Sequence, residues 1–410
     1  MTTLEKWILG LFGLSLVAAF TSQSLVDLSD ILLTLTALTL AFRRKRFRFF
    51  FTSFRPAGLW VVWLVTVIVG LGINVGFQDP KPWNEFLEFR WILTFLAILF
   101  LVGELSAAAA HLHQVWLWLL IPLNAAALVL FLQDPHWRVQ GILKQTMSFS
   151  HNIAPLWCLF AVSSLISWKT LSRREQGLRA LVVLTTGLLT LFTFTRGVWI
   201  GSAVAALAAL WLWNRKAFSA ALLGGLALAA TLVFTNQRIH DRVFTKTVNE
   251  TQSNDERWAL WRGNWRMIQD YPLLGVGFQQ NKYHLRRYYD EFGYPPGQRE
   301  SHAHNQYLQV WGGTGTLGLL CFVAFNFLLL RLAVQGYRKS TTVLAEGWHL
   351  GLFSALLCFM IGALTESNFN IAKNRLLFLI FAGFAVHRAL KLSNPRSGDR
   401  SSDTQNLSPA

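Results

Sequence analysis

Residues 306–330 of this chain read QYLQVWGGTGTLGLLCFVAFNFLLL and contain no charged side chain. A run this long and apolar is typical of a membrane-spanning helix, because about 20 residues rising 1.5 Å each cross a hydrocarbon layer of about 30 Å. Lipid offers no partner to backbone N–H and C=O groups, so such runs must be helical. Twelve runs of this kind occur: 7–22, 24–42, 56–77, 91–106, 112–132, 152–168, 178–195, 197–213, 217–235, 306–330, 346–365 and 375–391.

Every cluster of positive charge falls after an even-numbered apolar run. The clusters are residues 43–46 with Arg48 and Arg55; Lys169, Arg173, Arg174 and Arg179; Arg215 and Lys216; Arg331, Arg338 and Lys339; and Arg388, Lys391, Arg396 and Arg400. Because Lys and Arg accumulate on the cytoplasmic side of membrane proteins, this pattern places both termini in the cytoplasm and residues 236–305 outside. Topology therefore accounts for the net charge of +16, and nucleic acid is not expected as a partner.

The pattern predicts an all-α integral membrane protein. It has about 12 transmembrane helices, and a large external loop containing interfacial helices lies between helices 9 and 10. We divide the chain into helices 1 to 6 over residues 1–177, a core over 178–330 that includes the loop 236–305, helices 11 and 12 over 331–392, and a disordered cytoplasmic tail over 393–410. The tail is polar and rich in serine, a composition that does not support a packed structure.

The external loop carries one clear helix signal. Ser253 and Glu256 have the spacing of a capping box, which predicts that a helix begins there and ends near Pro272. An apolar stripe at helical spacing follows the cap: Trp258, Trp261, Trp265 and Ile268. Indole rings favour the depth of the lipid headgroups, so this helix is expected to lie along the membrane surface.

Cationic side chains collect on the same predicted side of the membrane. The candidates for contacting an anionic substrate are Arg196, Arg257, Arg262 and Arg138. Arg196 lies in a short turn between two apolar runs, where a charge is costly unless it has an anionic partner or reaches water along its own stem. Binding to lipid headgroups alone is the alternative for Arg262, and both interpretations stay open.

His304 is the candidate general base. Ser301 is expected to cap the tenth span, which puts His304 in or near its first turn. The positive end of a helix disfavours a second positive charge, so we expect a neutral imidazole near pH 7 that accepts a proton from a hydroxyl of a bound sugar or glycolipid. The alternative is a histidine that only forms hydrogen bonds at the start of the helix.

No metal is expected. His302 and His304 flank one alanine, but no cysteine or acidic cluster completes a ligand set, and the chain has no Asp-x-Asp motif. Glu366 follows the eleventh span on the outer side. We interpret it as an ordinary interfacial carboxylate, and the alternative is that it orients the imidazole or binds sugar hydroxyls.

Several of these motifs together resemble the O-antigen ligase family, which shares a domain with the O-antigen polymerases. They are TRGVW at 195–199, Arg257 with Trp261, YPLLGVG at 271–277, and HAHN at 302–305 followed by Gly312, Gly315 and Gly318. The resemblance covers about residues 181–325. Each fragment is loose by itself, but their order and spacing make the combination fairly specific.

The resemblance implies a glycosyltransferase of the bacterial inner membrane that works on the periplasmic side. Its donor would be an undecaprenyl-diphosphate-linked glycan and its acceptor a hydroxyl of lipid A-core, with neither a metal nor another cofactor. By position, His304 matches the family's essential histidine, and Arg196 and Arg257 match its essential arginines. Arg262 and Arg138 are weaker candidates for contacting the diphosphate.

Two other functions remain open. An O-antigen polymerase uses the same donor and differs only in its acceptor, which the residues do not reveal. A transporter of twelve helices belongs to a different class, in which polar residues commonly lie near the middle of the bilayer. Charges in the middle of the predicted spans are few here, and the largest insertion is external, so transport is less favoured.

Overall fold

The computed structural model describes residues 1–46, 90–105, 109–133, 138–142, 144–244, 248–298 and 300–393. Within these ranges helices are joined by turns and loops, and no strand occurs. The prediction of an all-α protein is therefore confirmed for this part of the chain. The third predicted span and the predicted tail beyond Ser393 lie outside the described residues.

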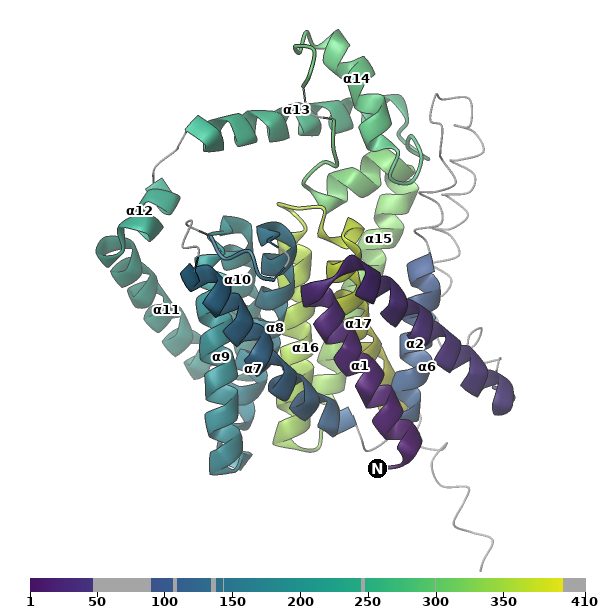
Figure 1. Ribbon diagram of the computed structural model, residues 1–410, viewed down its shortest axis with the longest axis vertical. Coiled ribbons are helices and arrows are strands. Elements are labelled where there is room, and N and C mark those ends of the chain that lie inside the picture. The colour runs from purple at the N-terminus through teal and green to yellow at the C-terminus, as the bar shows by residue number, and fades with distance from the viewer. Residues whose placement is uncertain are drawn as a thin grey trace, which may run out of the picture.

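Long helices form a bundle, and shorter helices of the predicted external loop lie across one of its ends (Figure 1). The bundle contains α1 (Thr3–Thr21), α2 (Gln23–Arg43), α6 (Trp91–Glu104), α7 (Ala109–Gln133), α8 (Thr146–Ser167), α9 (Arg173–Phe192), α10 (Arg196–Trp213), α11 (Arg215–Thr235), α15 (Gln306–Arg338), α16 (Val343–Gly362) and α17 (Ala372–Ser393). The loop contributes α12 (Gln237–Phe244), α13 (Val248–Asp270) and α14 (Asn281–Glu291). The short 3₁₀ helices η2 (Trp168–Thr170) and η3 (Asn368–Asn370) lie in connections.

Each predicted run within the described residues coincides with a helix, and eight of these helices are long and apolar enough to cross a membrane. They are α1, α2, α7, α8, α10, α11, α15 and α16. The apolar helix α6 has only 14 residues, whereas α9 carries several charges in its first two turns. The helices are those of a multi-pass membrane protein, and the count of about 12 spans stays a prediction, because eight helices of the described part meet this criterion.

The centre of the bundle is the close pair α8 and α16. A Cβ added at Gly351 of α16 would come within 2.6 Å of the Leu159 carbonyl on α8, and one at Gly347 would come within 2.8 Å of the Ser163 carbonyl. Small residues let membrane helices approach closely, which matters because lipid provides little hydrophobic drive for helix association. The loop that follows α16 is thereby fixed against the start of α8, where His151 lies 3.4 Å from the Gly362 carbonyl.

The helices α13 and α14, which we call the cap, have a small core of their own, and α13 runs crosswise over the end of the bundle (Figure 1). This core contains Ala259, Leu260, Met267, Val276, Leu285, Tyr288 and Tyr289. The predicted Trp stripe divides, because Trp258 and Trp265 are 65% and 49% exposed while Trp261 packs on the core. The expected start of the helix near Ser253 was wrong, since α13 already begins at Val248.

Glycines attach this cap to α15. The N–H of Val276 donates to the Gly312 carbonyl at 2.9 Å, and that of Gly277 donates to the Gly313 carbonyl at 2.8 Å. Gly315 interrupts α15 with φ 67° and ψ −173°, a conformation that essentially only glycine adopts. A Cβ there would lie 2.1 Å from the Leu273 carbonyl oxygen. The glycines quoted from the sequence therefore serve close backbone contact between the cap and the bundle.

Buried amides strengthen the same junction. Asn281 of α14 donates from Nδ2 to Oδ1 of Asn264 on α13 at 2.6 Å, and its Oδ1 accepts from Nε2 of Gln309 on α15 at 2.9 Å. All three side chains are at most 4% exposed. Hydrogen bonding of buried polar groups in one network holds the three helices in a single arrangement.

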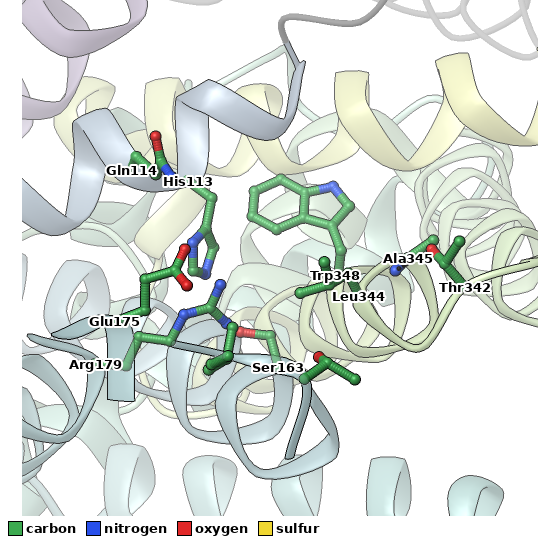
Figure 2. Close-up of a pocket in the computed structure, with 11 residues that line it drawn as sticks. His113, Gln114, Ser163, Glu175, Arg179, Thr342, Leu344, Ala345 and Trp348 are labelled. Carbon is green, nitrogen blue, oxygen red and sulfur yellow. Dashed lines mark hydrogen bonds between the residues drawn. The ribbon is translucent and has the colours of Figure 1, made fainter. Parts of the chain in front are cut away.

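The other end of the bundle contains a cavity of about 310 Å³ (Figure 2). It lies where α7, α9 and α16 begin and α8 ends, and its walls include His113, Arg179 and Trp348. The helix α16 has 20 residues, so its two ends are about 30 Å apart at 1.5 Å per residue. This cavity is therefore well separated from the cap.

Candidate active site

The segment from Ser301 to Asn305 connects the cap to α15. Asn305, rather than the expected Ser301, caps the helix, because its Oδ1 accepts from the N–H groups of Tyr307 at 3.0 Å and Leu308 at 3.1 Å. His304 consequently lies just before the helix and not in its first turn. Its φ of 47° falls in the left-handed region, which is strained for a residue with a side chain and is found most often at functional sites.

Both backbone groups of Ala303 are held in place between the two histidines. Gln309 Oε1 accepts from the Ala303 N–H at 2.8 Å, and Trp261 Nε1 donates to the Ala303 carbonyl at 2.8 Å. Ala303 itself is fully buried. The inward-facing Trp of the predicted stripe thus positions the histidine segment.

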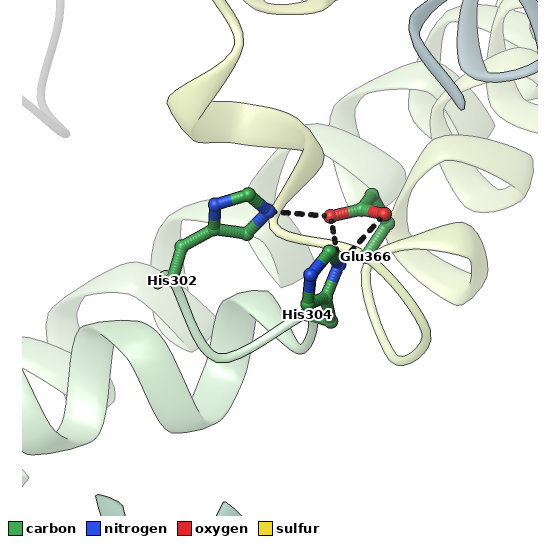
Figure 3. Close-up of side chains that lie close together, drawn as sticks. All are labelled: His302, His304 and Glu366. Carbon is green, nitrogen blue, oxygen red and sulfur yellow. Dashed lines mark hydrogen bonds and ion pairs between the residues drawn. The ribbon is translucent and has the colours of Figure 1, made fainter. Parts of the chain in front are cut away.

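Glu366 brings the two histidines together (Figure 3). Its carboxylate lies in the loop after α16, 2.9 Å from His304 Nδ1 and 3.0 Å from His302 Nε2. The Glu366 side chain is 2% exposed, against 16% for His304 and 38% for His302. The interpretation of Glu366 as an ordinary interfacial carboxylate was wrong, because it is buried and forms hydrogen bonds with both rings.

Gln306, the first residue of α15, supports the Glu366 loop. Its N–H donates to the Ala363 carbonyl at 2.8 Å, its Oε1 accepts from the N–H of Phe369 at 3.1 Å, and its Nε2 donates to Asn370 at 3.1 Å. The start of α15 therefore carries both parts of the site, with the histidines immediately before it and the glutamate loop fastened to it.

The histidines control the charge of Glu366. Burial favours the neutral acid, but hydrogen bonds with His302 and His304 outweigh burial and hold the pKa of Glu366 well below its usual value. The group is therefore a carboxylate at neutral pH. A neutral His304 that donates from Nδ1 to this carboxylate carries its lone pair on Nε2, which makes Nε2 the proton acceptor.

The same three residues also meet the basic requirement for a metal site. One ligand atom from each of His302, His304 and Glu366 lies within 4.8 Å of the other two. The reason for expecting no metal was in part wrong, because Glu366 supplies the acidic group that the local sequence lacks. When Glu366 is a carboxylate, the imidazole nitrogens that bond it carry protons, and a metal at this place would have to displace those protons.

Arg196 begins α10, directly beside the Glu366 loop. A Cβ at the next residue, Gly197, would lie 2.1 Å from Oγ1 of Thr365, so the start of α10 and this loop are in close contact. No carboxylate of a described residue forms an ion pair with Arg196 or Arg257. Both arginines thus lack an anionic partner in the described part of the chain.

Arg138 joins Arg196 through the turn before α10. Its Nε donates to the Thr193 carbonyl at 2.8 Å and its Nη2 donates to Thr195 Oγ1 at 3.0 Å. Burial, followed by the nearby charges of Arg257 and Arg196, lowers the pKa of Arg138 to about 10. It still carries its charge at pH 7, so these guanidinium groups repel one another in the absence of an anion.

Arg242 of α12 is a fourth member of this group, which the sequence reasoning missed. Its Nε donates to the Phe194 carbonyl at 2.8 Å. Burial lowers its pKa to about 10, and the charges of Arg138, Arg196 and Arg257 add to the effect. We call these four residues the arginine cluster. The signal that would have found Arg242 is its place on a short polar helix immediately after the ninth apolar run.

Arg262 is not part of the arginine cluster. Its guanidinium stacks 4.1 Å from the centre of the Phe292 ring, and its side chain is exposed on α13. Arg266, one turn further, pairs with Asp270 at 3.4 Å and Glu291 at 3.3 Å. The structure therefore brings Arg196, Arg257 and Arg138 together, as the sequence suggested, and places Arg262 elsewhere on the cap.

Residues 181–323 match the family described as O-antigen ligase, and no curated protein matches the chain. The matched range includes Arg196, Arg257 and His304 and stops before Glu366, whose place in the site comes from the structure alone. This match covers about a third of the chain and supports assigning that region to the O-antigen ligase and polymerase family, whose members are glycosyltransferase-like membrane enzymes.

Proposed function

We propose that the protein is an O-antigen ligase. It transfers a glycan from undecaprenyl diphosphate to a hydroxyl of lipid A-core, at the periplasmic face of a bacterial inner membrane, with inversion and without a metal. The observation that carries the proposal is the pairing of His304 with a buried carboxylate at the end of the bundle where the arginine cluster lies.

The arginine cluster suits the donor. The diphosphate of the lipid carrier is already a good leaving group, so the protein mainly has to neutralise the charge that develops on it. Planar guanidinium groups do this through paired hydrogen bonds to phosphate oxygens. Four cations with mutual repulsion accommodate a multivalent anion better than a monovalent one, which favours a diphosphate over a carboxylate. Arg262 remains a sequence-based candidate for contacting the donor, further out on the cap.

His304 suits the acceptor. Nε2 takes the proton from the acceptor hydroxyl while its oxygen forms a bond to the anomeric carbon of the donor sugar. The bond from that carbon to the diphosphate oxygen breaks, and the diphosphate leaves with the electron pair toward the arginine cluster. Glu366 stabilises the imidazolium that forms, as a carboxylate beside a catalytic histidine does. A single displacement of this kind inverts the anomeric centre.

The decisive experiment mixes purified full-length protein with lipid-linked glycan and lipid A-core in the presence of a chelator, and detects products by mass. Glycan on lipid A-core, formed in chelator at the rate seen without it, is the expected result. Longer lipid-linked glycan in place of that product would identify a polymerase. Activity lost in chelator and restored by a divalent cation would overturn the metal-free mechanism, and no product with either acceptor would overturn the transferase.

A further inference from the structure

The cavity at the bundle end opposite Glu366 has polar walls that the proposed transfer does not use. Figure 2 shows His113 of α7, Arg179 and Glu175 of α9 and Trp348 of α16 gathered around it. With about 310 Å³ it is far larger than the roughly 30 Å³ share of one water molecule, and it reaches the lower range of small-ligand pockets.

Arg179 is buried there with an incomplete set of partners. It is 7% exposed, its Nη1 donates to Ser167 Oγ at 3.2 Å, and its Nε has no hydrogen-bond partner in the described part of the chain. Glu175 is close enough to interact electrostatically but forms no ion pair with it. A buried guanidinium normally requires an oxygen acceptor for each of its outward N–H groups, because an unsatisfied buried donor is costly.

His113 adds further unpaired polar atoms. It is 6% exposed, its ring lies between those of Phe160 at 4.8 Å and Trp348 at 5.5 Å, and neither ring nitrogen has a hydrogen-bond partner among the described residues. The two aromatic contacts fix the plane of the imidazole. Its polar edge is therefore held beside Arg179 without a partner from the protein.

The helix ends favour negative charge in the same place. The helices α7, α9 and α16 begin at this cavity and α8 ends there, so the partial positive charge of three N-termini outweighs the partial negative charge of one C-terminus. Glu175, the carboxylate in the wall, already accepts from Ser172, from its N–H at 3.0 Å and its hydroxyl at 2.8 Å, in a capping box. It thus acts mainly as a cap, and the Nε–H of Arg179 and one ring N–H of His113 remain as free donors within the described ranges.

We propose that this cavity binds a phosphate group, in contact with Arg179 and His113. Phosphate oxygens match the guanidinium fork and accept several N–H donors at once. The group comes either from a lipid headgroup or from a soluble phosphate. This site lies about 30 Å from the candidate active site, at 1.5 Å per residue of α16, and does not depend on the transferase proposal.

Two variants test the site without removing buried groups. Ala345→Glu places a carboxylate in the cavity wall, and it completes a capping box with Thr342, so α16 is expected to form normally. Leu344→Trp narrows the rim at a position that is 49% exposed. The matched control is Arg174→Gln, which removes an exposed cation of the same helix α9 that lies over Trp118.

The measurement is thermal unfolding of full-length protein in a phosphate-free detergent, titrated with phosphatidylglycerol, diacylglycerol or inorganic phosphate. We expect stabilisation by phosphatidylglycerol and not by diacylglycerol, with at least tenfold weaker apparent affinity in Ala345→Glu and Leu344→Trp and no change in Arg174→Gln. Stabilisation by inorganic phosphate as well would assign a soluble source. Equal responses of wild type and both cavity variants, or no response to either phosphate compound, would overturn the proposal and leave a cavity filled by water.

Discussion

The two ends of the bundle place the same residue type in opposite surroundings. At the capped end, His304 lies 2.9 Å from the buried carboxylate of Glu366, whereas at the other end His113 lies between Phe160 and Trp348 with neither ring nitrogen hydrogen-bonded. A buried imidazole serves as a base only when a partner determines which nitrogen carries the proton. The difference is the basis for proposing proton transfer at the capped end and binding alone at the other.

The largest expected effect is the loss of the base at the capped end. His304→Ala should lower transfer about 10²- to 10⁴-fold, the usual contribution of a general base, while the protein still inserts and folds. Transfer is measured as glycan attached to lipid A-core. His111→Ala, which removes an exposed histidine near the other end, is the matched control and should retain full activity. Transfer that persists in His304→Ala would contradict the assignment of proton transfer to the capped end.

Substitution in the arginine cluster should cause the second-largest loss of transfer. Arg257→Ala removes a cation that has no carboxylate partner among the described residues, and the loss of one such stabilising group costs about 10²- to 10³-fold in rate. Arg262→Ala is the control from the same helix, because that side chain stacks on Phe292 outside the cluster. We expect a much smaller loss for it in the same assay. Equal losses in the two variants would show that proximity to the cluster is not what matters.

The partner of the histidine should have a smaller effect than the histidine itself. Glu366→Gln keeps the shape of the side chain but removes the charge that stabilises a protonated His304, so transfer should fall by less than the loss of about 10²- to 10⁴-fold expected without the base. His302→Ala should be milder still, because His302 is the more exposed ring and only shares Oε1 of the carboxylate with His304, which also contacts Oε2. A larger loss in His302→Ala than in Glu366→Gln would reverse these roles.

Glu366 also makes stability depend on pH. Its pKa is lowered in the folded protein, so the unfolded chain binds more protons below the ordinary value of 4.5, and the contribution of Glu366 to stability is lost as pH falls from there toward the folded value. Thermal unfolding at pH 4 and pH 7 should therefore differ more for wild type than for Glu366→Gln. The same pH dependence in both would contradict the assignment.

The smallest effect concerns the contact between Gly315 and the segment before α14. Gly315→Ala and Gly293→Ala both place a side chain at positive φ, of 67° and 70°, which costs about 1 to 3 kcal/mol, and the ψ of −173° at Gly315 adds to that cost. Only at Gly315 does the new Cβ meet another atom, the Leu273 carbonyl oxygen, whereas nothing lies within 4 Å at Gly293. Gly315→Ala should therefore unfold at the lower temperature. Equal melting temperatures would show that the cap contact adds no stability.

Local pattern predicted the helices well and the site only in part. Apolar runs identify membrane helices because each helix satisfies its own backbone, without help from distant residues. The sequence analysis assigned the N-cap of α15 to Ser301, but Asn305 provides it. Both residue types are good N-caps, and only the path of the backbone distinguishes them. The number of spans was harder to predict, because α9 contains a predicted apolar run but carries charged residues in its first two turns.

The sequence alone determined three things: the predicted collection of charged and aromatic residues on one side of the membrane, the order of the motifs, and the choice of His304, Arg196 and Arg257 as candidates. Each of them depends on residue type and spacing. The tertiary structure decided the place of Glu366, which meets His304 across 62 positions of the chain, and that of Arg242, which joins arginines from three other segments. It also separated Arg262 from them. Contacts of this kind depend on how helices pack against one another, and no local periodicity encodes which side chains then come to share one small volume.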